Sequence, residues 1–336
     1  MNTIQSIFAA PISWLYGAAV WVRNTLYGER LVHSHGVTVP TICVGNLAVG
    51  GTGKTPMVEY LVSMLSPKYR VAVLSRGYRR HTRGFVLADA SSTALTIGDE
   101  PMQIHLHFPD VPVAVCKDRV HGIKHLQRLF PDLQCVILDD AFQYRRLHAG
   151  FNILLTAADC LYVDDHYLPW GRLRDNVSQS LRANVVVVTK CPPTLTPIQK
   201  RILDSKLNLP TYQHLYFSSV CYPPITEKGN PLVLTGIARP EYLQDYIRSL
   251  YPNATFLTYP DHHRWSDDEL QHLEQDATYY SFVLTTDKDM ARLRDMNISD
   301  SLRAKLIPVS VTMDISEPDL FRRQITTYVS ENNRKH

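Results

Sequence analysis

The hydrophobic residues of the first half of the chain fall into short, mainly apolar runs. Runs of this kind, rich in Val, Ile and Leu, are typical of buried strands. They lie at 37–44, 70–75, 111–115, 135–140, 151–156 and 183–189. After the first run, apolar residues recur from Met57 to Leu65 at helical spacing, which predicts a helix beginning near Lys54. Strands that alternate with helices predict an α/β fold with a mainly parallel sheet and flanking helices.

The second half of the chain repeats this alternation after a break. Pro192, Pro193 and Pro197 mark a change of organisation, and residues 210–230 have the pattern of extended connectors. Beyond them, strands are predicted at 231–238, 255–258, 281–285 and 305–311, and helices at 240–250, 266–275 and 318–330. The predicted domains are therefore a first domain (31–210), a linker (211–230) and a second, smaller α/β domain (231–336).

Residues 1–30 follow a third pattern. No charged side chain precedes Arg23, and Pro11 and Gly17 interrupt an apolar stretch that is already short for a spanning helix, which needs about 20 apolar residues. The apolar side chains near one helical face are Ile4, Ile7, Phe8, Ile12, Leu15, Ala19 and Val22. Tryptophans and tyrosines along the segment are typical of a bilayer interface. Two predictions stay open: an amphipathic helix that lies in a membrane surface, or one whose apolar face packs on the protein's own core.

Composition adds few constraints to this picture. The 336 residues are enough for two domains with separate cores, and 45% hydrophobic with 20% charged residues is ordinary for a globular protein. A formal net charge of +3 says little about partners, and no nucleic-acid partner is predicted. The six cysteines stand singly, with no Cys-x-x-Cys pair, which indicates a reducing compartment and no structural zinc site.

The segment 44–56, Val-Gly-Asn-Leu-Ala-Val-Gly-Gly-Thr-Gly-Lys-Thr-Pro, joins the first predicted strand to the helix after it. In this setting backbone N–H groups cradle phosphates, and the helix N-terminus adds a partial positive charge. The residues that would supply these groups are Gly50, Gly51, Thr52 and Gly53. Lys54 would reach the β and γ phosphates of ATP, and Thr55 would ligate Mg²⁺. The first glycine of the usual pattern falls on Ala48, so we interpret the segment as a variant phosphate loop in a P-loop NTPase-like domain.

Carboxylates follow the predicted strands at two further places. Asp139 and Asp140 end the run at 135–140, as in the second nucleotide element, where a buried strand delivers a carboxylate to Mg²⁺. Asp99 stands in a turn before a helical stretch. It is either the N-cap of that helix or an acid close to the phosphates, and spacing alone leaves both open.

Motifs in the same order along most of the chain resemble those of the tetraacyldisaccharide 4′-kinase family, the lipid A kinases of Gram-negative bacteria. The matching segments are 44–56, Leu74-Ser-Arg-Gly-Tyr78, Gly98-Asp-Glu-Pro101, Leu138-Asp-Asp-Ala-Phe-Gln143, Leu168-Pro-Trp-Gly-Arg-Leu-Arg174, Thr189-Lys190, Gly236-Ile-Ala-Arg-Pro240, Asp261-His-His263 and Thr286-Asp-Lys-Asp289. Each motif is modest alone, but their shared order makes the resemblance strong.

The resemblance implies transfer of the γ-phosphate of ATP to the 4′-hydroxyl of a tetraacylated glucosamine disaccharide 1-phosphate, which gives lipid IVA. It implies ATP and Mg²⁺ as cofactors, and the acylated disaccharide and a membrane surface as partners. The implied location is the cytoplasmic face of the inner membrane, with peripheral attachment. The implied fold is a pair of α/β domains with the nucleotide in the cleft between them.

The resemblance also implies roles for single residues. Asp99 would be the base that removes the proton of the sugar hydroxyl, supported by a histidine, for which we choose His262 over His263. Lys54 would act with them on the transferred phosphate. The candidates for substrate contacts are Asn46, Arg76, Arg119, Gln143, Arg174 and Asp175. The three arginines among them suit the 1-phosphate or the transition-state charge, because a planar guanidinium matches phosphate oxygens.

The chain departs from the family pattern at several positions. Ala141 and Tyr144 stand where the family has Gly and His, which puts a substrate contact by that histidine in doubt. Asp175 replaces Glu with a shorter carboxylate, and Trp170 replaces a usually small residue.

The main alternative is a membrane-associated switch ATPase of the ParA or MinD type, which also uses Gly-Gly-x-Gly-Lys-Thr. Those proteins carry a lysine immediately before the double glycine, where this chain has Val49. A nucleotide-gated adaptor without enzymatic activity is a second alternative. It leaves the clustered acids and histidines outside the loop unexplained.

Overall fold

The computed structural model describes the chain from residue 3 to residue 334, with side chains from residue 9 onward. Its strands are β1 (Thr41–Asn46), β2 (Val71–Ser75), β3 (Val86–Leu87), β4 (Val113–Val115), β5 (Cys135–Asp139), β6 (Phe151–Ala157), β7 (Val185–Cys191), β8 (His214–Cys221), β9 (Pro231–Thr235), β10 (Thr255–Thr258), β11 (Phe282–Thr286), β12 (Leu306–Val309) and β13 (Thr312–Ile315). Its α-helices are α1 (Thr3–Gly28), α2 (Lys54–Leu65), α3 (Ala94–Ile97), α4 (Asp99–His107), α5 (Arg119–Leu129), α6 (Pro197–Leu207), α7 (Glu241–Leu250), α8 (Asp267–Ala277), α9 (Asp287–Leu293), α10 (Asp300–Lys305) and α11 (Pro318–Asn333). Short 3₁₀ helices lie at Tyr162–Asp164 and Val177–Arg182.

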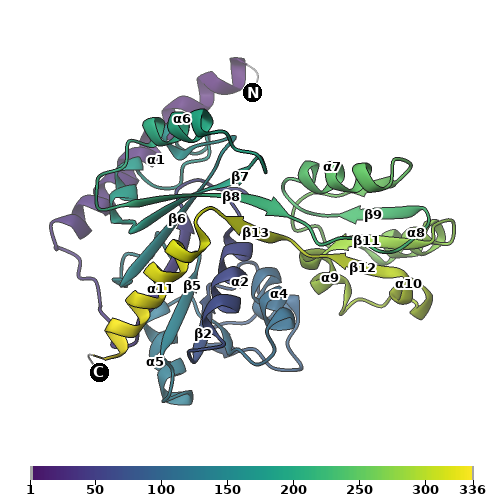
Figure 1. The fold of residues 1–336 in the computed structure, drawn as a ribbon, viewed down its shortest axis with the longest axis horizontal. Coiled ribbons are helices and arrows are strands. Elements are labelled where there is room, and N and C mark those ends of the chain that lie inside the picture. The colour runs from purple at the N-terminus through teal and green to yellow at the C-terminus, as the bar shows by residue number, and fades with distance from the viewer. Residues whose placement is uncertain (1–2, 335–336) are drawn as a thin grey trace.

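Within residues 3–334, nine strands form the larger sheet, in the order β13-β8-β7-β6-β1-β5-β2-β4-β3. Only the edge strands β13 and β3 pair in antiparallel fashion, and the described strands between them are parallel. Figure 1 shows this sheet with helices around it in the larger part of the molecule. The predicted α/β fold with a mainly parallel sheet is confirmed. Because β1 lies at the centre, the loop after it meets the carboxyl ends of its neighbours, where α/β sheets bind ligands.

Helices cover both faces of the larger sheet, which explains why its strands are mainly apolar runs. In β1, Ile42 and Val44 belong to the core beneath α2 and α11, whereas Cys43 belongs to the core beneath α5 and α6. Successive residues of a strand point to opposite faces of the sheet. Because both faces are covered by helices, all three side chains are buried. The phosphate loop therefore begins on a strand that is fixed from both sides.

A smaller sheet of four parallel strands, in the order β10-β9-β11-β12, forms within the described part of the second half. Val233 of β9 packs in one core with Leu243 and Ile247 of α7. On the opposite face, Leu232 and Leu234 share a core with α8 and α10. Figure 1 shows this second α/β unit beside the larger one.

The chain enters and leaves the second unit through adjacent strands of the first sheet. β8 ends at Cys221 and β13 begins at Thr312, and these two residues are partners in an antiparallel pair. After β13, α11 packs Phe321, fully buried, into the same core as α2. The predicted linker at 211–230 and the predicted boundaries of 231–336 are therefore wrong in part, because β8, β13 and α11 belong to the first domain.

These differences have a physical reason. The run Leu215-Tyr216-Phe217 has the residue types of a strand. Prolines follow it closely, however, and because of them the whole segment was predicted to be a connector. The closing helix shows an apolar stripe, yet such a stripe does not say which of two sheets it covers.

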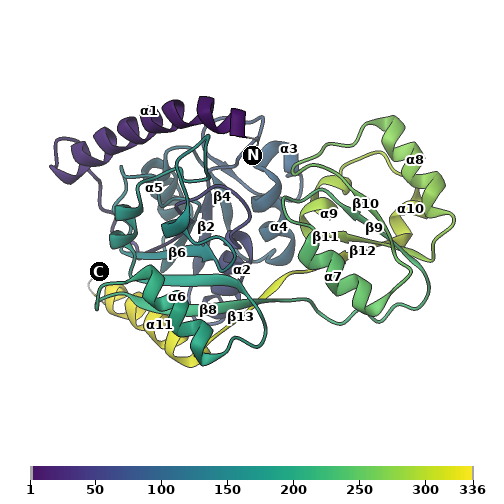
Figure 2. The ribbon, with the colours of Figure 1, turned by 90° about the horizontal axis from the view of Figure 1, so that it is seen from above.

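Helix α1 lies along the larger domain, on the side away from α11 in Figure 2. It turns a small and polar face inward, with Ser13, Gly17, Val20 and Asn24 buried. Its large apolar side chains face outward instead: Trp14 is 75% exposed and Trp21 is 60% exposed. The prediction that its apolar face packs on the protein's own core is wrong for the side chains from residue 9 onward.

The other exposed apolar residues of this outer surface are Ile12, Leu15, Val22 and Leu26. The side chains of Ile4, Ile7 and Phe8, predicted for the same face, lie outside the described residues, as do residues 1–2 entirely. Over the part of the chain that the structure covers, no helix is both long enough and apolar enough to cross a membrane.

Candidate functional site

The phosphate loop connects the end of β1 to the first residue of α2. Gly50 has a φ of 111° and Gly53 a φ of 83°, in the left-handed region that favours glycine. The buried Thr52 fixes the loop between them: its carbonyl accepts a hydrogen bond from Thr189 Oγ1 at 2.9 Å, and its hydroxyl accepts one from Asn46 Nδ2 at 2.7 Å. Gly53 is the N-cap of α2 and brings no side chain to cap the first turn, so the N–H groups there face a ligand site.

Lys54 and the two carboxylates at the end of β5 lie next to this loop. Lys54 Nζ is 4.0 Å from Asp140 Oδ1, and Asp139, only 5% exposed, accepts a hydrogen bond from Ser75 Oγ at 2.9 Å. Burial, together with the charge of Asp140, raises the pKa of Asp139 to about 6. Burial opposes ionisation of Asp140 as well, but Lys54 and Arg174 outweigh it and lower the pKa of Asp140 to about 2.

The residues around Asp139 fit a bound Mg²⁺. A buried carboxyl with a raised pKa gains from a cation beside it, and Asp139, Asp140 and the Thr55 hydroxyl are the hard oxygen donors that Mg²⁺ prefers. Among the described residues, no group of three or more His, Cys, Asp or Glu side chains forms a metal cage by itself. The remaining ligands of the ion would be phosphate oxygens and water.

Three of the predicted substrate residues, Asn46, Gln143 and Arg174, meet at the end of β1, and a fourth, Arg119, donates to the backbone of Asp140 nearby. Arg174 Nη1 donates to Asp140 Oδ2 at 3.0 Å, and its Nη2 contacts both Asp140 and the side chain of Asn46. Gln143 Nε2 donates to the Asn46 carbonyl at 2.7 Å. Arg119 is buried and donates to backbone carbonyls, among them that of Lys117 at 2.9 Å, and burial lowers its pKa. Arg119 therefore holds the backbone of the site, whereas Arg174 holds a carboxylate at its edge.

The other two predicted substrate residues lie differently. Arg76 follows β2, next to Ser75, and is exposed. Asp175 is completely buried under α1, where it accepts hydrogen bonds from Arg23 Nη2 at 3.0 Å and Asn24 Nδ2 at 2.7 Å. The prediction that Asp175 contacts substrate is therefore not supported. The two neighbouring side chains therefore have different surroundings: Arg174 contacts Asp140 in the site, whereas Asp175 contacts α1.

Asp99 is the first residue of α4, and Gly98 is the N-cap, so the alternative that Asp99 itself caps the helix is wrong. Asp99 Oδ2 lies 2.7 Å from His262 Nδ1 and accepts hydrogen bonds from Arg292 Nε at 2.9 Å and Arg292 Nη2 at 2.7 Å. Burial alone would raise the pKa of Asp99, but these two partners outweigh it and lower the pKa to about 2.

Both partners of Asp99 come from the second domain. His262 follows β10 with a φ of 61°, whereas His263 turns away and lies 3.1 Å from Glu269. Arg292 of α9 is 7% exposed and is fixed by Asp289 Oδ1 at 2.7 Å. The sequence reasoning missed Arg292. The sequence did hold one indication of it. Arg292 stands three residues after Asp289, a spacing that lets two side chains form an ion pair on one face of a helix.

Charged side chains connect the two groups of residues. Glu100, next to Asp99, lies 3.0 Å from Lys288 Nζ, which in turn lies 3.2 Å from Asp261. Glu100 also contributes to the raised pKa of Asp139. The carboxylates beside the phosphate loop and those at the start of α4 are therefore within electrostatic reach of one another.

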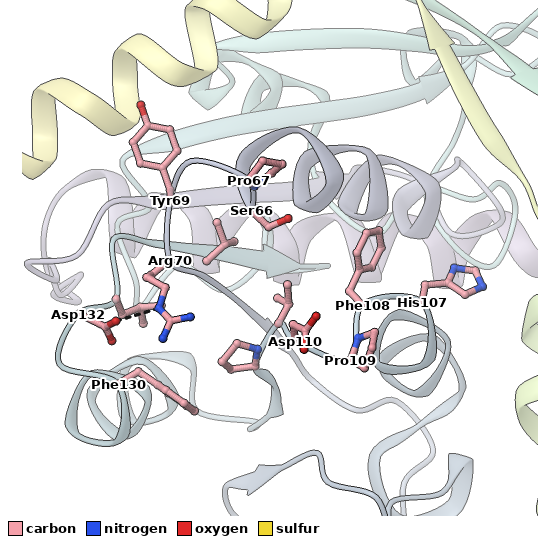
Figure 3. Close-up of a pocket in the computed structure, with 14 residues that line it drawn as sticks. Ser66, Pro67, Tyr69, Arg70, His107, Phe108, Pro109, Asp110, Phe130 and Asp132 are labelled. Atoms are coloured by element: carbon pink, nitrogen blue, oxygen red, sulfur yellow. Dashed lines mark hydrogen bonds and ion pairs between the residues drawn. The ribbon is translucent and has the colours of Figure 1, made fainter.

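A separate cavity of about 470 Å³ lies at the opposite end of α2 from the phosphate loop. Figure 3 shows it between the turn after α2 and the end of α4, with the Arg70–Asp132 ion pair on one side and His107 at the other edge. Its lining contains none of the residues of the phosphate loop or of the Asp99 group. It therefore has no part in the site described above.

Residues 5–330 match the family described as Tetraacyldisaccharide-1-P 4′-kinase. Among curated relatives, a "Tetraacyldisaccharide 4′-kinase" of Bacteroides thetaiotaomicron is 41% identical, over 96% of this chain and 93% of the relative. A protein of the same description from Flavobacterium johnsoniae is also 41% identical, over 99% of both chains.

A solved structure has the same fold. LpxK from Aquifex aeolicus, determined in complex with ATP, superimposes with a TM-score of 0.74 over 95% of this chain and 98% of its own, at 24% sequence identity. The likeness therefore extends over both α/β units.

Proposed function

Because the chain belongs to the tetraacyldisaccharide 4′-kinase family, we propose that it transfers the γ-phosphate of ATP to the 4′-hydroxyl of a tetraacyldisaccharide 1-phosphate. The product is lipid IVA, an intermediate of lipid A biosynthesis. The observation that carries this proposal is the arrangement of two groups, one within the first domain and one at its contact with the second. A phosphate loop with Lys54 and the Asp139–Asp140 pair stands on one side, and Asp99 with His262 and Arg292 stands on the other.

The first group binds the donor. The loop N–H groups and Lys54 hold the β and γ phosphates, while Thr55, Asp139 and Asp140 would hold Mg²⁺. The ion neutralises charge on the phosphate oxygens when it is bound. Phosphoryl transfer depends mainly on positioning and charge neutralisation, which is what fixed loop amides and a lysine supply.

The second group handles the acceptor. The 4′-oxygen attacks the γ-phosphorus, the bond from that phosphorus to the β-phosphate oxygen breaks to leave ADP, and the hydroxyl proton passes to Asp99. With a pKa of about 2, Asp99 is ionised at neutral pH and ready to accept it. It is a weak base, but the loose transition state of phosphoryl transfer needs more orientation than basicity. His262 and Arg292 supply that orientation, and the exposed Arg76 is available to the substrate 1-phosphate.

The outer surface of α1 binds the membrane that carries the acceptor lipid. Exposed tryptophan and aliphatic side chains on a helix that does not cross the bilayer suit a helix lying in its surface. The enzyme then works as a peripheral protein on the cytoplasmic face of the inner membrane.

The test is transfer of labelled phosphate from ATP to purified tetraacyldisaccharide 1-phosphate in the presence of Mg²⁺. Label is expected on the lipid, and a substrate analogue without the 4′-hydroxyl should receive none. The alternative, a switch ATPase, predicts ATP turnover that rises with self-association and leaves the lipid unlabelled. That result would sink the kinase proposal.

A further inference from the structure

The end of α4 that lies away from Asp99 carries a second interdomain contact. His107, the last residue of α4, has Nδ1 at 3.0 Å from Glu59 Oε1 and Nε2 at 3.4 Å from Asp287 Oδ1. Glu59 lies on α2, and Asp287 is the first residue of α9 in the second domain. One imidazole therefore joins three helices from two domains.

Both ring nitrogens of His107 face a carboxylate oxygen, so both must donate, which only the imidazolium can do. Its two partners are nearly buried, with 11% and 7% of their side chains exposed, while His107 is 29% exposed. Asp287 and then Glu59 raise the pKa of His107 to about 10. A cation also suits the last turn of a helix, where the dipole is negative.

Two uncharged side chains also donate to the carboxylates of this bridge, but they cannot supply the positive charge of His107. Gln103 Nε2, one turn earlier on α4, donates to Glu59 Oε1 at 2.9 Å, and Ser310 Oγ donates to Asp287 Oδ1 at 3.1 Å. Neither group carries charge. Without the imidazolium, two nearly buried carboxylates would face one another without a cation between them, which disfavours this packing of α2 against α9.

Each of the three helices carries a reactive group at another position. α2 begins with Lys54, α4 begins with Asp99, and α9 carries Arg292, five residues beyond Asp287. We propose that His107 is a positioning residue, whose charged bridge fixes α2 and α9 against α4 and so sets Asp99 relative to Lys54. The proposal rests on the proposed function for the role of Asp99. Because reacting groups displaced by about 1 Å can cost about 10²-fold in rate, a loosened bridge acts on turnover.

The test compares His107→Gln, which loses the charge, with His107→Lys, which keeps it. The matched control is His105→Gln, because His105 lies on the same helix and its ring Nε2 lies 3.1 Å from the Asp89 carbonyl of its own domain. We expect His107→Gln to lose about tenfold in kcat with an unchanged Kd for ATP, and His107→Lys to regain most of it. His105→Gln should match the wild type. Amides of α4 and α9 should exchange hydrogen faster in His107→Gln alone.

A double variant separates positioning from folding. His107→Gln with Asp287→Asn removes one of the facing carboxylates, so it should fold even if the single variant does not, and it should keep the loss in kcat. Wild-type kcat in His107→Gln or in the folded double variant would overturn the proposal, as would a loss in kcat that His107→Lys fails to repair. If Asp99→Asn remains fully active, it is the proposed base that fails, so the two failures are distinguishable.

Discussion

The donor side and the acceptor side of the site are built in opposite ways. The donor side, from the phosphate loop to Asp139 and Asp140, comes entirely from the first domain and is centred on one buried strand. The acceptor side joins Asp99 of the first domain to His262 and Arg292 of the second, 163 and 193 residues away. A single domain fixes the donor side, whereas the acceptor side exists only while the two domains are in contact.

The largest effect is expected on the donor side. Lys54→Ala should lower kcat by about 10³-fold, because it removes a fixed positive charge from the transferred phosphate. Labelled phosphate transfer to the lipid measures it. Lys68→Ala, at an exposed lysine just beyond α2, is the matched control and should leave the rate unchanged. An unaffected rate in Lys54→Ala would remove the donor side from the mechanism.

On the acceptor side, Asp99→Asn keeps the shape but cannot take the proton. We expect a loss of about 10²-fold in kcat with an unchanged Kd for ATP, measured by transfer assays and by nucleotide titration. His262→Ala should also lose far more rate than His263→Ala, whose histidine bonds to Glu269 instead. Weakened ATP binding in Asp99→Asn would show that the two sides are not separable.

The two sides should also differ in stability. The folded pKa of Asp139 is raised from 3.8 to about 6, so its ionisation opposes folding increasingly as pH rises from 3.8 to 6. Asp139→Asn should therefore stabilise the Mg²⁺-free protein at pH 7 by up to about 3 kcal/mol, and the gain should vanish below pH 3.8. Thermal unfolding across this pH range measures it.

Asp99 behaves in the opposite sense. Its folded pKa is lowered to about 2, so its contribution to stability is present above 3.8 and is lost as pH falls through 2. Asp99→Asn should destabilise the protein at pH 7. A gain in stability there would contradict the contrast between the two carboxylates.

A smaller effect tests the geometry of the acceptor side. Arg292→Lys keeps the charge but loses the planar fork that reaches both Asp99 and Asp289. We expect a loss of about tenfold in kcat, and a larger loss in Arg292→Met, in steady-state transfer assays. Arg294→Lys, two residues along the chain at an exposed site, should have no effect.

The smallest effect on turnover is expected from the outer surface of α1. Trp14→Ser with Trp21→Ser should leave kcat unchanged on detergent-dispersed substrate but weaken binding to anionic lipid vesicles, measured by co-sedimentation. Leu181→Ser, at an exposed apolar residue outside α1, is the control. Undiminished vesicle binding in the double variant would exclude α1 as the membrane contact.

The donor side could be predicted from the sequence much further than the acceptor side. The strand before the phosphate loop, Lys54 and the Asp139–Asp140 pair are local patterns, so they could be predicted from the residues alone. The partners of Asp99 depend on how two domains dock. The resemblance to a family pointed to His262. For Arg292 the local signal was only its spacing from Asp289, which does not predict a contact with Asp99, and the bridge at His107 was missed altogether.

The remaining errors come from side-chain direction. Asp175 adjoins Arg174 in the sequence, but Arg174 contacts Asp140 in the site while Asp175 accepts a hydrogen bond from Asn24 of α1. In α1, the buried face consists of Ser13, Gly17, Val20 and Asn24, so of the two predictions left open, the one in which the apolar face turns inward is wrong.

The pairing of Cys221 with Thr312 means that the second domain is an insertion in the first, entered and left at one point of the sheet edge. The two cut ends would lie about 5 Å apart, a gap that a two-residue hairpin turn closes. A shortened chain joined there would keep β8, β13 and α11, and with them the whole donor side. We expect such a chain to bind ATP and to transfer no phosphate, and nucleotide titration can check this. The second domain is thus a separable insertion. A different domain inserted at the same edge of the sheet could give the same nucleotide-binding domain a different substrate.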